Sequence, residues 1–147
     1  MGAGGDRSFI EAPFEWPVRV YYEDVDLQGV VYFANYFKYM ERARTEWLRS
    51  LGVDQRRLFD EERRYFVVVD TNADFLIPAQ FNDELIATAR LVGLTRATFL
   101  IEQNIYRSKL DGELICKGMA RAAYVNADTR KPLRVPTSIF KDSFNDN

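Results

Sequence analysis

The densest group of residues that could carry out chemistry lies within residues 21–36. In this segment an expected strand is followed by Asp26, by a turn at Gly29 and then by the start of a helical pattern. Backbone N–H groups from Val31 to Phe33 would be unpaired, because an α-helix leaves its first N–H groups without partners. Such donors suit an oxygen that becomes negative during a reaction, and Asp26 could attack a carbonyl carbon or activate a water molecule. The spacing predicts an acyl-transfer site that needs neither histidine nor metal.

Two plainer interpretations fit the same acids. An aspartate just before a helix is favoured as an N-cap or first-turn charge, a role that stabilises a helix by about 0.5–2 kcal/mol without any catalysis. Asp24 and Asp26 also form a D-x-D pair that could bind a metal ion, although no further set of ligands accompanies the pair. Glu41 is a third carboxylate, in the middle of the expected helix, where a solvated or interface charge is the simpler interpretation.

The composition removes several other kinds of site. The 147-residue chain has no histidine and one cysteine, which excludes Ser–His and Cys–His pairs, an internal disulfide and a zinc site built from several thiolates. The formal net charge is −2 and no basic stretch dominates, so nucleic acid is not expected as a partner. No apolar run approaches the ~20 residues that span a bilayer, and the first residues lack the apolar segment of a secretory signal. We therefore expect a soluble, cytoplasmic protein.

The elements that would position the acid and the donors begin with a strand over Val18–Asp24, which is rich in β-branched and aromatic residues. After the turn at Gly29, apolar residues recur every three or four positions, which predicts one long helix with an apolar stripe. This stripe comprises Phe33, Tyr36, Phe37, Met40, Ala43, Trp47, Leu48 and Leu51. Gly52 is expected to end the helix, and Asp54 to cap a short second helix that runs through Phe59.

The second half of the chain changes to the two-residue period of strands. Four strands are expected, over Tyr65–Leu76, Glu84–Gly93, Ala97–Ser108 and Glu113–Asn126. Alternate positions in the second and fourth of these strands are small or apolar, so a helix could lie close against that face, and Cys116 on it would be a buried, unreactive thiol. The predicted fold is α+β, with an antiparallel sheet of about five strands wrapped around one long central helix.

The chain is expected to form a single domain over residues 16–139, since domains of roughly 100–150 residues are common. No internal repeat or low-complexity segment suggests a second unit. Residues 1–15 are expected to form a flexible lead-in, and residues 140–147 a loose tail.

Several motifs taken together resemble a known family. They are Val18-Arg19-Val20-Tyr21-Tyr22-Glu23-Asp24-Val25-Asp26, Gly29-Val30-Val31-Tyr32, Asn35-Tyr36, Met40-Glu41-Arg42-Ala43-Arg44-Thr45-Glu46-Trp47-Leu48, Asn72-Ala73-Asp74-Phe75, Pro78-Ala79 and Asp83. They look like the motifs of the Tol-Pal-associated (YbgC-type) acyl-CoA thioesterases, in the 4-hydroxybenzoyl-CoA thioesterase branch of the hotdog fold. The resemblance covers residues 16–138. It implies a hydrolase that cleaves acyl-CoA or acyl-carrier-protein thioesters to a free acid and a thiol.

The resemblance also implies roles for individual residues. Asp26 matches the catalytic aspartate of the family, which acts as a nucleophile or general base. The backbone N–H of Phe33 matches the donor that polarises the thioester carbonyl, and Tyr22 matches a tyrosine that lines or supports the site. Four further residues of this segment are expected to bind substrate: Gly29, Val31, Tyr32 and Tyr36. For the two tyrosines, core packing is an equally good interpretation.

The assembly implied by the resemblance is a homodimer whose two sheets join edge to edge, and dimers of this family often pair into homotetramers. Coenzyme A enters as part of the substrate, so neither a separate cofactor nor a metal is implied. Peripheral association with a membrane or a cell-envelope complex is implied by the family alone.

Phe33 is the position at which the chain departs from the pattern of these proteins. Many YbgC-type members have histidine there, whereas hydroxybenzoyl-type members have an aromatic residue. Phe33 is expected to make the pocket more apolar and to change the choice of substrate, and it leaves open a non-catalytic acyl-CoA or acyl-carrier-protein binding module on the same fold. A helix-first barrel, such as an isomerase or a dehydratase, fits less well because a strand precedes the long helix.

Overall fold

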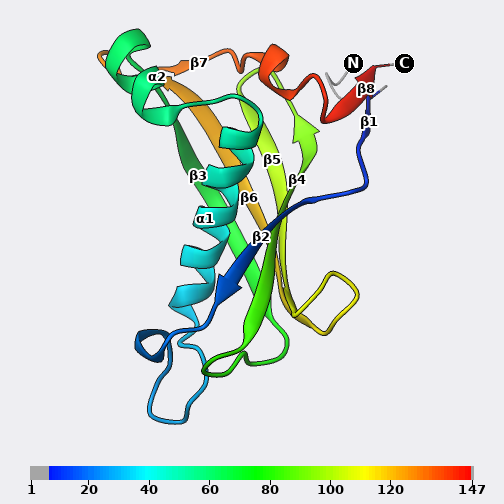
Figure 1. The fold of residues 1–147 in the computed structure, drawn as a ribbon. Coiled ribbons are helices and arrows are strands. Elements are labelled where there is room, and N and C mark those ends of the chain that lie inside the picture. The colour runs from blue at the N-terminus through cyan, green and yellow to red at the C-terminus, as the bar shows by residue number, and fades with distance from the viewer. Residues whose placement is uncertain (1–6, 147) are drawn as a thin grey trace.

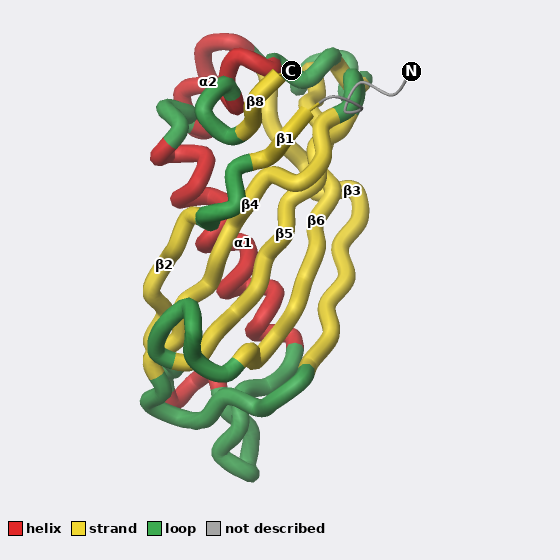
Figure 2. The backbone as a smooth tube through the Cα atoms, turned by 90° about the vertical axis from the view of Figure 1, so that its right-hand side faces the viewer, coloured by secondary structure: helices red, strands yellow, loops and turns green. Residues whose placement is uncertain are grey.

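The main sheet of the protein is antiparallel, and one long helix lies across one of its faces (Figure 1). The computed structural model describes residues 7–146. The sheet is built from β2 (Phe14–Arg19), β3 (Arg64–Phe75), β4 (Glu84–Leu94), β5 (Thr98–Arg107) and β6 (Leu114–Asn126), with the short β7 (Pro132–Leu133) beside β6. Their order across the sheet is β2-β4-β5-β6-β3, so β2 and β3 form its two edges (Figure 2). The predicted α+β architecture is confirmed.

The long helix, α1, spans Ala34–Ser50, and a shorter helix, α2, spans Gln55–Glu62. Gly52 lies between them with a φ of 93°, a conformation that glycine adopts without steric cost. The Asp54 side chain accepts a hydrogen bond from the Arg57 N–H at 3.1 Å and so caps α2, as predicted. Neither helix, nor any other helix in the described part of the chain, is long and apolar enough to cross a membrane.

Small residues on the strands allow α1 to lie close to the sheet. The alanines of β4 and β6 that face the helix are almost completely buried: Ala87, Ala89, Ala120 and Ala122. Gly118 on β6 shows how little room is left, since a Cβ atom there would lie 2.6 Å from Met40 Cε and 2.8 Å from the Gln103 carbonyl oxygen. The predicted contact between an aromatic-rich helix and a small-residue sheet face is therefore confirmed.

The first strand of the main sheet differs from the predicted segment. Strand β2 ends at Arg19, and Tyr22–Asp24 form a short 3-10 helix, η1, instead of the last residues of a strand. The Asp24 side chain accepts a hydrogen bond from the Tyr21 N–H at 2.8 Å, and the Asp24 N–H donates to the Tyr21 carbonyl at 3.0 Å. These local bonds compete successfully with the strand propensity of the two tyrosines.

The expectation of a flexible lead-in and a loose tail is wrong for the described residues. Strand β1 (Arg7–Phe9) pairs with β8 (Phe144–Asp146), and Phe9 contacts Phe144 with ring centroids 6.2 Å apart. Just before β8, a second 3-10 helix, η2 (Thr137–Phe140), places Phe140 in the core, where its ring stacks on Trp47 at 5.6 Å. Burial of aromatic side chains thus orders both ends. The remaining residues of these two segments, 1–6 and 147, lie outside the described part of the chain.

We expect Phe140→Ala to lower the free energy of unfolding by about 3–5 kcal/mol, the usual cost of removing a fully buried phenylalanine. Phe140 is completely buried and also contacts Phe99, at 4.9 Å between ring centroids. Denaturant unfolding would measure the loss. Phe59→Ala, at a ring that is 41% exposed on α2, is the matched control and should cost less than half as much. Equal losses of stability in the two variants would show that the Phe140 side chain does not contribute to the core as its burial indicates.

Candidate active site

The acid and the start of α1 are held together by a tight loop, drawn below the helix in Figure 1. Val25 and Val31 form an antiparallel bridge across the neck of the loop. Inside the neck, the Asp26 N–H donates to the Val30 carbonyl at 2.9 Å, and the Gly29 N–H donates to the Asp26 carbonyl at 3.0 Å. Gly29 has a φ of 79°, so the turn uses the backbone freedom that the sequence predicted for it.

Asp26 is exposed, next to the neck of this loop. Its Oδ1 atom accepts a hydrogen bond from the Gln28 N–H at 2.8 Å, two residues further along the chain. The bond is a local side-chain turn, and helix α1 has no side-chain cap. The interpretation of Asp26 as the N-cap of the long helix is therefore wrong, and the carboxylate keeps acceptor positions for other partners.

The two acids of the D-x-D pair have different surroundings. Besides its side-chain bond to the Tyr21 N–H, Asp24 accepts two hydrogen bonds at its carbonyl oxygen, from the Tyr32 N–H at 3.0 Å and from Asn35 Nδ2 at 2.9 Å. Asp24 is thus tied into the scaffold, whereas Asp26 faces outward. Within residues 7–146, no group of three or more His, Cys, Asp or Glu side chains could hold a metal ion, so the pair has no third ligand there.

Of the three backbone donors expected at the helix start, two are already used. The Val31 N–H donates to the Ala79 carbonyl at 2.8 Å, and the Tyr32 N–H donates to the Asp24 carbonyl at 3.0 Å. The Phe33 N–H has no hydrogen-bond acceptor among the residues that the structure describes. Because Phe33 has helical angles (φ −55°, ψ −33°), its amide belongs to the first turn of α1, where the helix dipole favours negative charge. Among the three predicted donors, the Phe33 N–H is therefore the one left open.

Aromatic and apolar side chains surround Asp26. An open pocket of about 570 Å³ is lined by Tyr22, Val25, Asp26, Leu27, Gly29 and Phe81. Tyr22 is mostly exposed and meets the edge of Phe81, with ring centroids 5.7 Å apart. The structure therefore brings together three of the residues that the sequence singled out, from η1 and from the loop that follows it.

A second aromatic group lies at the helix start. Phe33 is 54% exposed and contacts Tyr32 and Phe75, with ring centroids 4.9 and 5.8 Å away, respectively. Tyr32 is exposed as well. Phe33 thus faces outward beside its unpaired amide, instead of lying in the buried stripe of α1 as the spacing predicted. Its ring is available to a ligand at this end of the helix.

Two residues predicted to bind substrate lie in the core of the chain instead. Val31 is 5% exposed and Tyr36 is 3% exposed. The Tyr36 hydroxyl accepts a hydrogen bond from the Ala79 N–H at 3.0 Å, and burial raises the pKa of this hydroxyl. Both residues are hydrogen-bonded to Ala79, in the loop of residues 78–83, and so help to hold the candidate site in place. For Tyr36, periodicity could not distinguish a core residue from a residue of the pocket wall, because either role places an aromatic side chain on the inner side of the helix.

Asn35 contributes a contact that the sequence analysis did not assign. It is buried, and its side-chain amide donates to the carbonyl oxygen of Asp24, which ties the first turn of α1 to the acid-bearing segment. An asparagine at the second position of a helix is the available signal, since this residue is a poor helix former and needs a reason to be there.

The surroundings of Cys116 do not suit a nucleophile. It is completely buried on the small-residue face of β6, and burial raises the pKa of its thiol to about 12. A thiol becomes nucleophilic as the thiolate, so we expect no labelling of the folded protein by a disulfide reagent at pH 8. Stoichiometric labelling should appear only in denaturant. Rapid labelling of the native protein would mean that β6 opens, although β6 is hydrogen-bonded to a strand on each side, β5 and β3.

These features define a class of protein: a sheet wrapped around one long helix, the hotdog fold, with an acid and an open amide where the helix begins. Residues 20–142 match the profile of the thioesterase-like superfamily. The chain is 38% identical to the acyl-CoA thioesterase YbgC of Haemophilus influenzae over 126 residues, which cover 86% of this chain and 90% of that protein.

Solved structures agree with the assignment. A probable thioesterase from Bartonella henselae superposes with a TM-score of 0.78 at 33% identity, covering 85% of this chain and all of the other. A 4-hydroxybenzoyl-CoA thioesterase in complex with 4-hydroxybenzoyl-CoA has a TM-score of 0.81 and 18% identity, over 88% and 96% of the two chains, and shows the shared fold. The chain belongs to the thioesterase-like superfamily, as the resemblance of its motifs implied.

Proposed function

We propose that the protein hydrolyses acyl-CoA or acyl-carrier-protein thioesters to a free acid and a thiol. The observation that carries the proposal is the unpaired Phe33 amide at the start of α1, on the segment that also presents the exposed Asp26 carboxylate. The similarity to an acyl-CoA thioesterase over 86% of the chain supports the same activity. Coenzyme A enters as part of the substrate, so the proposal includes no separate cofactor.

In the proposed reaction the thioester carbonyl oxygen accepts a hydrogen bond from the Phe33 amide. Asp26 acts in one of two ways. As a general base it removes a proton from water while the water oxygen bonds to the carbonyl carbon, and the proton passes to the leaving thiolate as the C–S bond breaks. As a nucleophile its carboxylate oxygen bonds to the carbonyl carbon while the C–S bond breaks and the thiolate leaves. Water then hydrolyses the mixed anhydride, which restores the Asp26 carboxylate, and the thiolate takes up a proton released from that water. The amide stabilises the oxyanion in both routes.

The aromatic surroundings of the site favour an apolar acyl group. Phe33, Tyr32 and Phe75 form one exposed group, and Tyr22 and Phe81 form another. Thiol release from short, medium, long and aromatic acyl-CoAs, and from the same acyl groups on acyl carrier protein, would test the activity and identify the carrier. Tight binding of these thioesters without any thiol release would instead support a binding module on the same fold.

The proposed enzyme is a homodimer, joined through the outer edge of β3. This edge strand is 12 residues long, contains no buried residue and exposes Val67 and Val69. A strand whose outer edge is unpaired over this length is a template for pairing with another chain, and monomeric proteins usually shorten or cover such edges. A partner chain would also cover exposed apolar residues of the candidate site, such as Leu27 beside the acid and Phe75 beside Phe33. Pairing of two dimers into a homotetramer stays a prediction of the family resemblance.

Sedimentation of a charged edge variant would test the dimer. Val69→Lys places a charge at the centre of the proposed strand pairing and should shift the protein toward the monomer. Ile10→Lys is the control, at an exposed apolar residue on the N-terminal segment, away from β3. A wild-type chain that sediments as a monomer at micromolar concentration would contradict the proposed assembly. Association with a membrane or cell-envelope complex stays a proposal based on the family alone.

A further inference from the structure

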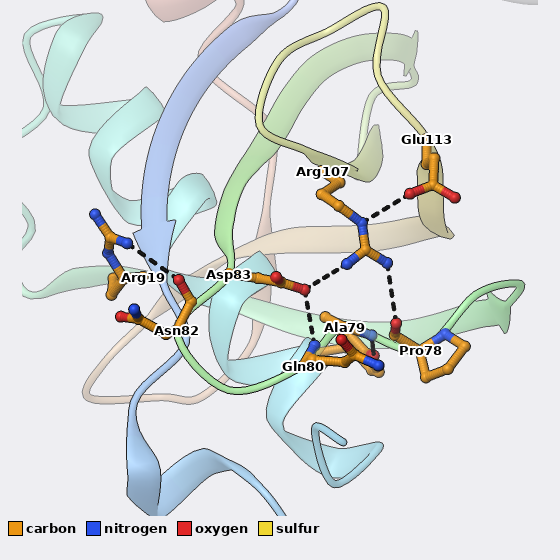
Figure 3. A network of polar contacts seen from close by, with 9 residues as sticks. Arg19, Pro78, Ala79, Gln80, Asn82, Asp83, Arg107 and Glu113 are labelled. Atoms are coloured by element: carbon orange, nitrogen blue, oxygen red, sulfur yellow. Dashed lines mark hydrogen bonds and ion pairs between the residues drawn. The ribbon is translucent and has the colours of Figure 1, made fainter. Parts of the chain in front are cut away.

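Arg107, at the end of β5, ties together three separate segments of the chain (Figure 3). One terminal nitrogen donates to Asp83 Oδ2, and the other donates to the Pro78 carbonyl at 3.1 Å. The Nε atom donates to Glu113 Oε1 at 2.8 Å. The carboxylate of Asp83 is shared further, because Oδ2 also accepts a hydrogen bond from the Gln80 N–H at 2.8 Å. Arg107 and Asp83 thus fix both ends of the loop formed by residues 78–83.

This loop is in turn the support of the candidate active site. The Ala79 carbonyl accepts the hydrogen bond from Val31, and the Ala79 N–H donates to the hydroxyl of Tyr36 on α1. The Phe81 N–H donates to the Gly29 carbonyl at 3.2 Å, and Gln80 bridges with Val30. The loop is therefore hydrogen-bonded both to the segment between Asp26 and the open Phe33 amide and, through Tyr36, to helix α1.

We infer that Arg107 and Asp83 are positioning residues for hydrolysis, which set the Phe33 amide and the Asp26 carboxylate in register through the loop of residues 78–83. The inference rests on the proposed function. Neither side chain lines the pocket around Asp26, so neither is expected to touch substrate. Their effect is transmitted by the backbone bonds of Ala79 and Phe81, and a displacement of about 1 Å at a reacting group can cost roughly 10²-fold in rate.

The geometry of Arg107 suits this role better than an ordinary surface charge does. Arg107 and Asp83 are each only about a fifth exposed (23% and 22% for the side chains). The guanidinium group presents its donors in a fixed plane, so one side chain can hold a carboxylate and a carbonyl at the same time. Lysine has a single ammonium centre without this fixed fork and cannot reproduce both contacts in the same plane. The pair Arg63–Asp128, at 45% and 62% exposure, is a chemically similar pair that makes no contact with this loop.

The test compares Arg107→Met, Arg107→Lys and Asp83→Asn with Arg63→Met as the matched control. We expect kcat to fall about 10²-fold in Arg107→Met with KM changed less than threefold, because substrate contacts are retained. Arg107→Lys should not restore kcat. Asp83→Asn, which keeps size and an acceptor oxygen, should lose part of the activity and guards against a variant that fails to fold. Arg63→Met should keep wild-type kcat.

Hydrogen exchange at the amides of Val31 and Phe81 provides a readout that does not depend on activity. Both amides should exchange faster in Arg107→Met than in Arg63→Met, with the middle of β5 unchanged in both. Wild-type kcat in Arg107→Met, or equal exchange in the two variants, would overturn the inference. If the wild type releases no thiol from any acyl-CoA, the proposed function fails and the catalytic part of the inference fails with it. Faster exchange at Val31 and Phe81 in Arg107→Met would then show only that the pair holds the loop of residues 78–83 against the acid-bearing segment.

Discussion

Asp26→Asn is expected to reduce thiol release from acyl-CoA by about 10²–10⁴-fold, the usual contribution of a positioned base, while the protein stays folded. The carboxylate is exposed, and it accepts a hydrogen bond from the Gln28 N–H at 2.8 Å. The asparagine side-chain oxygen can accept the same bond, so the turn should survive and only the negative charge and basicity are lost. Steady-state kcat together with the thermal unfolding midpoint would measure the two effects separately.

Glu23→Gln is the matched control for this substitution. Glu23 is an exposed acid three residues away, on the 3-10 helix η1, and its neutralisation should leave kcat within about twofold of wild type, since exposed charges interact weakly with their surroundings. An Asp26→Asn variant that retains more than a tenth of wild-type turnover would contradict the assignment. A large loss in Glu23→Gln would point to a general effect of charge near the pocket.

The framework of the fold follows from local pattern in the sequence. The three- and four-residue steps of apolar residues located α1, and alternating small residues located the helix-facing sides of β4 and β6, because both periods report the direction of side chains directly. The pairing of β1 with β8 was missed because these strands have three residues each and lie more than 130 positions apart. A strand this short carries no detectable period. The tertiary contacts of Phe140 with Trp47 and of Phe144 with Phe9 explain why the chain returns there.

The site was only half accessible from the sequence. The acid and the glycine turn of the candidate site could be predicted because residue types and spacing indicate them directly, and the catalytic role of Asp26 stays a prediction. Which amide stays open was not visible, because the Val31 N–H donates to the Ala79 carbonyl, 48 positions away. Ala79 lies in a loop whose Pro78 carbonyl accepts a hydrogen bond from Arg107. An arginine at the end of a strand has no local signature of its own. Tertiary hydrogen bonds of this kind decide which donor is free, and they leave no period in the sequence.

Phe33→Pro is expected to lower kcat by about 10²–10³-fold, the usual cost of removing one oxyanion-hole donor. A backbone donor normally resists mutagenesis, but Phe33 is a favourable position for deleting one. Its φ of −55° lies within the range that the proline ring imposes, and its N–H has no acceptor in the described part of the chain that would be lost. Proline is also well tolerated at the start of a helix. Thiol release and circular dichroism of the same preparation would measure activity and fold together.

Phe33→Ala separates the amide from the ring. It keeps the N–H and removes the aromatic contacts with Tyr32 and Phe75, so it should change KM and the preference among acyl groups while kcat stays within about tenfold of wild type. The contrast between alanine and proline is the informative quantity, because both variants lack the ring and only proline lacks the donor. If the two variants have equal kcat with the fold intact, the Phe33 amide is not the oxyanion donor. If proline alone is inactive, the open amide at the start of α1 takes part in the reaction.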